Sequence, residues 1–380
     1  MQKQIYAKIN PKILEWMRKS SNLSVDEVTR KSKIKKQLLL EAEKVDSILT
    51  IKQLRKLAQI YSRPLSSFYL NEIPEDIQLP DFRTPYNKEV VITGELNTLI
   101  REFKEKKKFA EELSRLENIT NDYSFIGKFN ENDSNSEISS FILKLLKIDR
   151  DEISKKRDND ILNLWKEKIE SLGILVFQFQ KIDLLITRGF SFSDPPMPII
   201  ILNQKDTYYA RVFTLIHELA HILLNSVGIC DSNEKIEPEN RIESKCNAIA
   251  SLTLVPKDEF EEQLKIFPKI NKEINLVLES LSRYFKTSWS VILIRLKELE
   301  LITQNEFLES KNYLQKKQKS KSQGGNYYTL LLSSESKTYY KMVFNALNSD
   351  KISFNEAMNY LNVSYKVLRN LEQKGAAGEF

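Results

Sequence analysis

The sequence RVFTLIHELAHILL, at residues 211–224, sets two histidines in a strongly apolar run. His217 and His221 are four residues apart, so on a helix they project from the same face, one turn apart. Both imidazoles can then reach one metal ion at about 2.0–2.1 Å. Glu218 lies between them, near enough to contact a metal-bound water without being a ligand itself. The apolar flanks predict a buried helix, in which polar side chains need partners.

The histidine pair is distinctive because the 380 residues contain only these two histidines. The pattern HExxH is short and has false positives in long, histidine-rich chains. With two histidines in all, random placement rarely produces this spacing together with a glutamate in the second position. The alternative is a pair of core histidines satisfied by hydrogen bonds. We favour the metal site.

A catalytic zinc site has three protein ligands and an open water position, so two histidines are one ligand short. With no histidine left, the third ligand must be Asp, Glu or Cys. The candidates downstream are Cys230, Asp231, Glu234, Glu237, Glu239, Glu243 and Cys246. Glu243 is favoured because it shares the inward face of a predicted helix with Cys246 and Ala250, where a carboxylate is costly unless paired or metal-bound. Glu239 is next in line, and a solvated position is the alternative for Glu243.

These residues predict a zinc-type metalloendopeptidase. The metal would lower the pKa of its water towards about 7 and polarise the scissile carbonyl. Glu218 would act as general base and deliver the proton to the leaving amine. Two histidines and a carboxylate suit zinc and also permit manganese. A metal-dependent hydrolase acting on something other than a peptide is a weaker alternative.

Three residues at the start of the histidine helix are weaker candidates for contacts with substrate or oxyanion. They are Tyr208, Tyr209 and Arg211. An ordinary structural role at the helix start is favoured for all three. The two cysteines, Cys230 and Cys246, are expected to pack in the core rather than tune the site by oxidation.

The secondary-structure pattern around the histidine pair predicts an α+β core. Strands are expected over 174–179, 182–190 and 198–202, and helices over 138–148, 161–172, 207–225 and 239–254. A hairpin of two helices, 274–285 and 289–301, follows, and then a short strand at 327–332 and three short helices, 339–347, 353–361 and 365–371. A long polar helix is expected earlier, over 89–118.

The first seventy residues predict five short helices with a tight turn between the second and third, the pattern of a helix-turn-helix domain. Capping boxes start the helices at Ser24 and Thr50. The third helix, 35–44, is the candidate recognition helix, and the candidate DNA contacts are Lys33, Lys35, Lys36 and Gln37. Because Glu41 and Glu43 on that helix would repel phosphate, DNA binding and use as a dimerisation or substrate-docking module are about equally favoured.

The composition is that of a folded globular protein. Hydrophobic residues make up 41% and charged residues 29%, which excludes a disordered chain and a coiled-coil rod. The longest apolar runs fall far short of the roughly 18 residues of a membrane span, and the polar N-terminus carries no signal peptide. Two cysteines fit a reducing compartment, so a cytoplasmic location is expected. The net charge of +6 is compatible with nucleic acid but does not prove it.

Three segments together resemble the ImmA/IrrE family of metallopeptidases: PIIILN (198–203), RVFTLIHELAHILL (211–224) and IESKCNAIASLTLVP (242–256). The resemblance implies a minimal zincin-like α+β domain whose metal ligands are His217, His221 and Glu243 and whose catalytic residue is Glu218. The sequence departs from the family pattern at Ala220, Cys246, Ile249 and Thr253. None of these departures removes a ligand.

The resemblance extends to both ends of the chain. PLSSFYL (64–70) and LPDFR (79–83) resemble the arrangement in which an XRE-type helix-turn-helix domain precedes the peptidase, and residues 281–302 and 324–328 resemble its C-terminal part. This implies cleavage of a regulatory protein, a helix-turn-helix repressor or a neighbour-encoded toxin–antitoxin partner. The rival is a DNA-binding regulator or antitoxin whose zincin domain serves as a sensing or partner-binding module.

The expected organisation follows from these elements. We expect a helix-turn-helix domain at 1–70, a linker and long helix at 71–136, the zincin-like metallopeptidase domain at 137–260, a helical extension at 261–315, a basic linker at 316–326 and a small C-terminal helical unit at 327–380. The substrate, the activating signal and the oligomeric state are not indicated by any motif.

Overall fold

The computed structural model describes residues 6–21, 23–46, 48–61, 63, 65–73, 82–83, 94–180, 182–225, 238–266, 274–317 and 333–376. The chain divides into two units. The first comprises 1–79 and 91–105, and the second comprises 80–90 and 106–380. Each unit has its own hydrophobic core, and each is described by itself.

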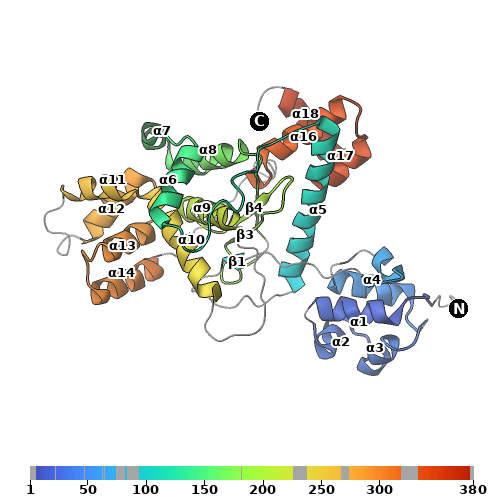
Figure 1. Cartoon of the computed structure of the whole chain (residues 1–380). Helices are drawn as coiled ribbons and strands as arrows, with labels where there is room; N and C mark the ends of the chain where they lie inside the picture. The colour runs from blue at the N-terminus through green and yellow to red at the C-terminus, as the bar shows by residue number, and fades with distance from the viewer. Residues whose placement is uncertain are drawn as a thin grey trace. The chain divides into compact units, whose positions relative to one another are not determined.

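The first unit is all-helical (Figure 1). Its elements are α1 (Pro11–Ser20), α2 (Val25–Ser32), α3 (Lys36–Ala42), α4 (Ile51–Ile60), the 3-10 helix η1 (Leu65–Tyr69) and the first half of α5 (Gly94–Glu117). Ser24 and Thr50 form the two predicted capping boxes, with Glu27 and Gln53. The core contains side chains from α1, α2, α3, α4 and η1, among them Ile13, Val28, Leu39, Leu57 and Phe68.

The helix α3 is shorter than predicted, because it begins at Lys36 and ends at Ala42. Lys35, before it, provides no side-chain cap, and Lys33 has left-handed backbone geometry with φ 59°. The turn from α2 to α3 therefore includes Lys35, the residue that was expected to start the helix. Arg18 of α1 fixes the other end, since it makes two hydrogen bonds of 2.6 and 2.8 Å to Glu43.

The second unit contains a four-stranded mixed sheet, which confirms the predicted α+β class. The strands are β1 (Phe82–Arg83), β2 (Leu175–Phe179), β3 (Gly189–Phe192) and β4 (Ile199–Asn203), in the order β1-β3-β4-β2. The central strand β4 is parallel to β2 and antiparallel to β3, and β1 is antiparallel to β3. Every residue of β2, β3 and β4 is buried.

The strand predicted over 182–190 was wrong for most of its length, because β3 begins only at Gly189. Asp183 explains the difference. Its side chain accepts a hydrogen bond from the backbone N–H of Leu185 at 2.9 Å, and its carbonyl accepts one from Ile186 at 3.1 Å. These local bonds satisfy the backbone in a turn, so the apolar residues that follow Ile182 do not extend into a strand.

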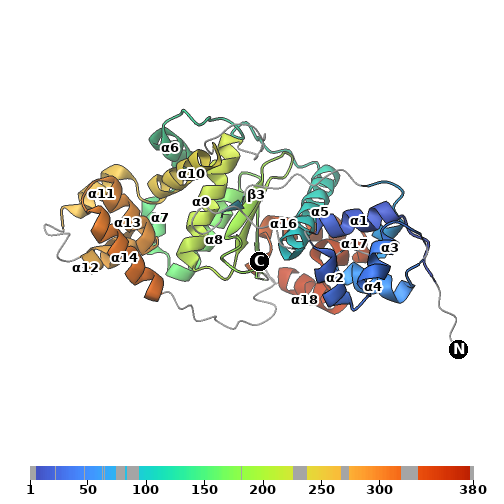
Figure 2. The same cartoon turned by 90° about the horizontal axis from the view of Figure 1, so that it is seen from below.

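The helices of this part of the chain are α6 (Asn135–Leu145), α7 (Arg150–Lys155), α8 (Asp158–Glu170), α9 (Tyr208–Leu224), α10 (Pro238–Leu254), α11 (Lys257–Leu264), α12 (Ile274–Phe285), α13 (Trp289–Glu298) and α14 (Gln304–Lys317). The helices α8 and α9 pack on the sheet, whereas α11–α14 form a group farther from it, beyond α10 (Figures 1 and 2). The helix α9 lies at the centre and contacts β3, β4, α8 and α10. All residues from Arg211 to Leu223 are buried for this reason.

The C-terminal helices are α16 (Lys337–Asn348), α17 (Phe354–Leu361) and α18 (Tyr365–Ala376). A buried ion pair between Lys106 of α5 and Glu335 joins them to the rest of the unit. Thr338, at the start of α16, adds two 3.0 Å hydrogen bonds to Glu170 of α8. The predicted strand 327–332 lies outside the described residues, as does the predicted basic linker beyond Lys317.

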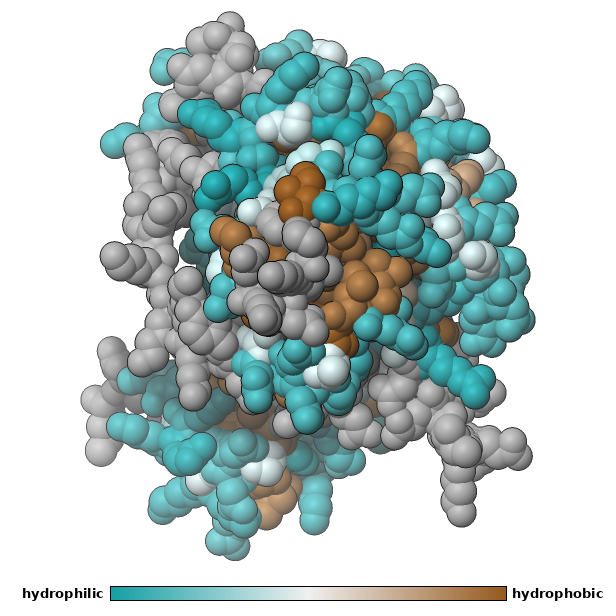
Figure 3. All heavy atoms as spheres, turned by 90° about the vertical axis from the view of Figure 1, so that its left-hand side faces the viewer, coloured by the Kyte–Doolittle hydropathy of each residue, from teal (hydrophilic) through white to brown (hydrophobic). Residues whose placement is uncertain are grey.

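Apolar side chains gather on the face that Figure 3 shows, over the helices α11–α14. The exposed apolar residues of this group include Ile266, Leu276 and Leu308. Among the described residues, no helix is both long enough and apolar enough to span a membrane.

Candidate metal centre

The two histidines of α9 lie side by side in the core of the second unit. Their Nε2 atoms are 3.0 Å apart, and their ring centroids are 4.7 Å apart. His217 is fully buried and His221 nearly so. The four-residue spacing on a regular helix therefore produces the juxtaposition expected of it.

Glu243 of α10 completes the group. Its Oε2 lies 3.4 Å from Nε2 of His217, and its Oε1 lies 3.1 Å from Nε2 of His221. Two other residues on the same face of α10, Cys246 and Ala250, are fully buried. A small residue at 250 and a cysteine at 246 allow α10 to pack closely on α9, and this brings the carboxylate to the imidazoles.

The neighbouring loop holds α10 in this place. Lys245 donates a hydrogen bond to the backbone carbonyl of Asp133 and one of 3.0 Å to Oδ1 of Asn135, the first residue of α6. At the other end of α10, Arg150 donates to the carbonyls of Thr253 and Leu254, at 3.3 and 3.1 Å. These bonds satisfy carbonyls that the helix leaves unpaired at its end.

The pKa of the Glu243 carboxyl lies below its ordinary value. Burial alone raises this pKa, but hydrogen bonds from His217 and His221 and the charge of these rings lower it by more. Glu243 is therefore ionised at neutral pH, which is the form that a metal ligand must have.

The three side chains fit a zinc ion. Their ligand atoms all lie within 4.8 Å of one another. Ligand atoms at about 2.0–2.1 Å from a tetrahedral zinc ion lie about 3.3 Å from each other. The two Nε2 atoms are 3.0 Å apart, and each lies 3.1 or 3.4 Å from a different carboxylate oxygen of Glu243, so small side-chain shifts bring one oxygen and both rings to that spacing. Two imidazoles and one carboxylate are also the donor set of catalytic zinc sites. His217, His221 and Glu243 would hold the ion.

Glu218 is buried beside the histidines and is tied to the sheet. Ser191 of β3 donates a 2.8 Å hydrogen bond to its Oε2. The sequence interpretation did not select Ser191. The available signal was the alternation of small and aromatic residues in Gly189-Phe190-Ser191-Phe192, which sets the small ones on one face of a strand.

The other candidate ligands are placed as follows. Cys230, Asp231, Glu234 and Glu237 lie outside the described residues. The backbone of Glu239 belongs to α10, but its side chain is outside the description. Cys246 is fully buried in the core. Within the described part of the chain, the group that can hold a metal ion is His217, His221 and Glu243.

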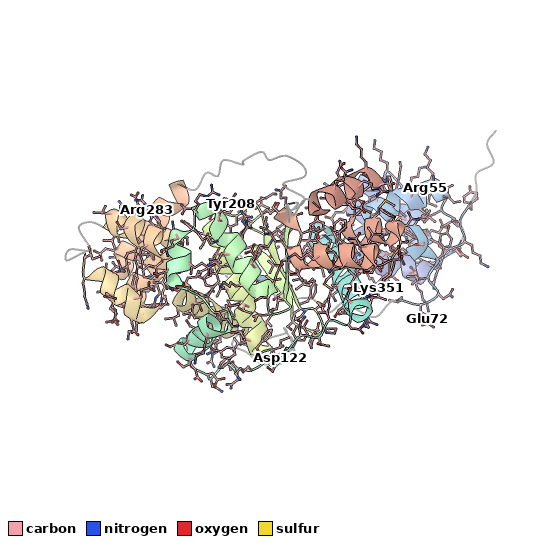
Figure 4. The ribbon with its side chains drawn as sticks, turned by 90° about the horizontal axis from the view of Figure 1, so that it is seen from above. Arg55, Glu72, Asp122, Tyr208, Arg283 and Lys351 are labelled. Carbon is pink, nitrogen blue, oxygen red and sulfur yellow. The ribbon has the colours of Figure 1, made fainter. Side chains whose placement is uncertain are left out.

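The residues at the start of α9 make structural contacts. Figure 4 shows Tyr208 at one end of this helix. The guanidinium of Arg211 lies 4.7 Å from the centre of the Tyr208 ring and donates a 2.5 Å hydrogen bond to Gln178 of β2. The hydroxyl of Tyr209 donates a hydrogen bond to the carboxylate of Asp158 in α8. These contacts agree with the structural role favoured for all three residues.

The candidate DNA-contacting residues belong to the first unit. Lys33, Lys35, Lys36 and Gln37 are all exposed. Lys36 makes a 2.7 Å ion pair with Asp26 of α2, in which both side chains are largely solvated. DNA binding by these residues remains a prediction.

The small mixed sheet, the buried helix with its HExxH motif and the carboxylate from the following helix define a metallopeptidase-like α+β domain. Comparison with known proteins supports this class. Residues 169–297 match the family model of the IrrE N-terminal-like domain, peptidase family M78. This segment contains His217, Glu218, His221 and Glu243.

Other comparisons say less. No curated protein matches the chain. Among solved structures, the chain is similar to a Mycobacterium tuberculosis transcriptional regulator, with 18% sequence identity and a TM-score of 0.28. The match covers 43% of this chain and 51% of that one, so it spans about half the length of the regulator.

Proposed function

We propose that this chain is a metal-dependent endopeptidase that cleaves a specific regulatory protein. The observation that carries the proposal is the convergence of His217, His221 and Glu243, with Glu218 buried next to them. Four polar side chains at one buried place are costly to the fold unless they serve a site.

The chemistry is divided between the ion and the protein. A bound zinc ion would supply a Lewis acid and a water of lowered pKa, about 7. Glu218 takes the proton from the attacking water and delivers it to the leaving amine. The hydroxyl of Ser191 holds Oε2 of Glu218 while this happens. The three ligands lie on two helices that pack directly against each other, so their spacing is maintained by the core.

The substrate we propose is a helix-turn-helix repressor or a neighbour-encoded toxin–antitoxin protein. The resemblance to the ImmA/IrrE family supports this class of substrate, and the matched family domain is in keeping with it. In this proposal the small all-helical first unit, which has a core of its own, is the module that docks the substrate.

The test compares the wild-type chain with Glu218→Gln. Each protein is loaded with zinc and incubated with the helix-turn-helix protein encoded next to its gene, and fragments are identified by mass spectrometry. We expect Glu218→Gln to keep about one zinc ion per chain. Its rate of cleavage should fall by at least about 100-fold, because general-base catalysis contributes about 10²–10⁴-fold. Equal cleavage by the two proteins would contradict the assignment of Glu218.

The second candidate function is a DNA-binding regulator whose metallopeptidase-like domain senses a ligand or partner. The exposed Lys33, Lys35 and Lys36 favour it. Binding to DNA upstream of the chain's own gene, measured at several salt concentrations, tests it. A steep salt dependence that flattens in Lys33→Ala/Lys35→Ala supports DNA binding. Weak binding that is the same for any sequence counts against it.

A further inference from the structure

The strand β3 approaches α9 so closely at Gly189 that there is no room for a side chain. A Cβ atom at this position would lie 2.6 Å from Cγ2 of Thr214 and 2.8 Å from the backbone oxygen of Ile201. Such distances are far shorter than ordinary contacts between heavy atoms, which begin at about 3.5 Å. Gly189 therefore sets the distance between the strand and the histidine helix.

The next residue on the same face of β3 makes the next contact with α9. Ser191 is two residues beyond Gly189, and Glu218 is four residues beyond Thr214, one turn further along the helix. Two residues of strand advance about 6.6 Å, and four residues of helix advance about 6.0 Å. The strand and the helix thus advance by nearly the same distance between these two contacts. For this reason Ser191 Oγ lies 2.8 Å from Glu218 Oε2.

We propose that Ser191 is the positioning residue for Glu218 and that Gly189 sets the approach that makes the bond. This inference rests on the proposed peptidase function. A glutamate side chain has several rotatable bonds, and its motion must be restrained if one carboxylate oxygen is to meet a reacting proton. The bond from Ser191 restrains Glu218 from outside its own helix, and it uses only one of the two oxygens.

The same segment offers a matched control. Ser193 directly follows the last residue of β3, two residues after Ser191, and both serines are 9% exposed. Ser193→Ala removes the same hydroxyl group from an equally buried position on the same segment. It leaves the bond to Glu218 in place.

The experiment uses the full zinc-loaded chain and acetohydroxamic acid, a small chelating acid that gives up a proton when it binds an open zinc position. Glu218 is the base that would receive this proton. We expect Ser191→Ala to weaken acetohydroxamate binding by about ten- to hundredfold, the order of the effect of losing one hydrogen bond to a charged group. Zinc affinity should be unchanged, since Ser191 is not a ligand. Ser191→Thr should restore most of the affinity, and Ser193→Ala should behave as wild type.

A purely structural role for Ser191 predicts a different result. The temperature of thermal unfolding would then be lower in Ser191→Ala, while the affinity for acetohydroxamate at saturating zinc stayed at the wild-type value. This outcome overturns the proposal. In a Glu218→Gln background, the effect of Ser191→Ala should shrink to less than about twofold, because the two residues act as a unit. If the effects of the two substitutions on acetohydroxamate affinity are fully additive, the proposal is also overturned. If the zinc-loaded wild type does not bind acetohydroxamate at all, the proposed peptidase function fails, and the role of Ser191 fails with it.

Discussion

Polar side chains replace apolar ones at the most buried part of the molecule. His217, Glu218 and His221 lie on a helix whose other buried residues are mostly apolar. Each of them has a polar neighbour on another element: Glu243 for the histidines and Ser191 for Glu218. The stability lost by burying them is reduced by these contacts, and a bound metal ion would reduce it further.

Glu243 should be indispensable for metal binding. We expect Glu243→Ala to reduce zinc from about one ion per chain to near zero, because a site of two histidines lacks the third protein ligand. Metal content of the purified protein measures this. Glu239→Ala is the control, one turn earlier on α10. Loss of zinc in the Glu239 variant alone would show that Glu239, and not Glu243, is the third ligand.

Lys166 of α8 provides a pH dependence that is independent of the metal centre. Its ammonium group is buried and donates to the carbonyls of Ser333 and Glu335, each at 3.4 Å. Burial lowers the pKa of Lys166 to about 8. The charged groups around it are Glu170, Arg211, Glu335 and Lys337. Between pH 8 and the unfolded pKa of about 10.4, the unfolded chain keeps a proton that the folded chain has lost, so the free energy of unfolding rises with pH.

We therefore expect the free energy of unfolding of the second unit to increase by about 1–2 kcal/mol from pH 8 to 9.5. Urea unfolding at a series of pH values measures this, with excess chelator throughout. Lys166→Met should remove the increase. The series stops at pH 9.5 because burial raises the pKa of Tyr61 and Tyr339, so that ionisation of these tyrosines in the unfolded chain opposes the trend above pH 10. A slope that is the same in the methionine variant would assign the effect to other groups.

The helices were easier to predict than the strands. Capping boxes and helical periodicity predicted most helices of the first unit within a few residues, and the spacing of His217 and His221 predicted that they share a face. The strand at 182–190 was misplaced because Asp183 forms a turn. The bond between Ser191 and Glu218 joins residues 27 positions apart and depends on how a strand packs on a helix. No local pattern encodes that distance. The structure brings the three predicted ligands together, while metal binding itself stays a prediction.

The contact between β3 and α9 should tolerate little change. We expect Gly189→Ala to destabilise the second unit by about 1–3 kcal/mol, the usual cost of overpacking a core. Thr214→Ala removes the Cγ2 atom that the new methyl group would meet at 2.6 Å, but not the backbone oxygen of Ile201. The double variant should therefore recover part of the lost stability. Denaturant unfolding measures both, and a Gly189→Ala variant as stable as wild type would show that the strand can move away.

The two units have separate cores, so zinc should act on one of them. Thermal unfolding should show two transitions, and zinc should raise only that of the second unit. At a free zinc concentration about 1,000 times its Kd, the stabilisation is about 4 kcal/mol. His217→Ala should abolish this shift and leave the other transition in place. If zinc raised both transitions equally, the units would not unfold independently.

Arg150 contacts three helices at once. Its guanidinium caps the end of α10 at Thr253 and Leu254, pairs with Glu259 of α11 at 3.1 Å and lies 5.8 Å from the centre of the Phe285 ring in α12. One hydrophobic core contains buried residues from Phe125 to Ile302, Phe260 and Phe285 among them. A shortened version of the protein that stopped at residue 260 would leave the partners of Phe260 behind and expose apolar surface to aggregation. The smallest fragment worth producing for crystallisation or screening therefore extends beyond Ile302.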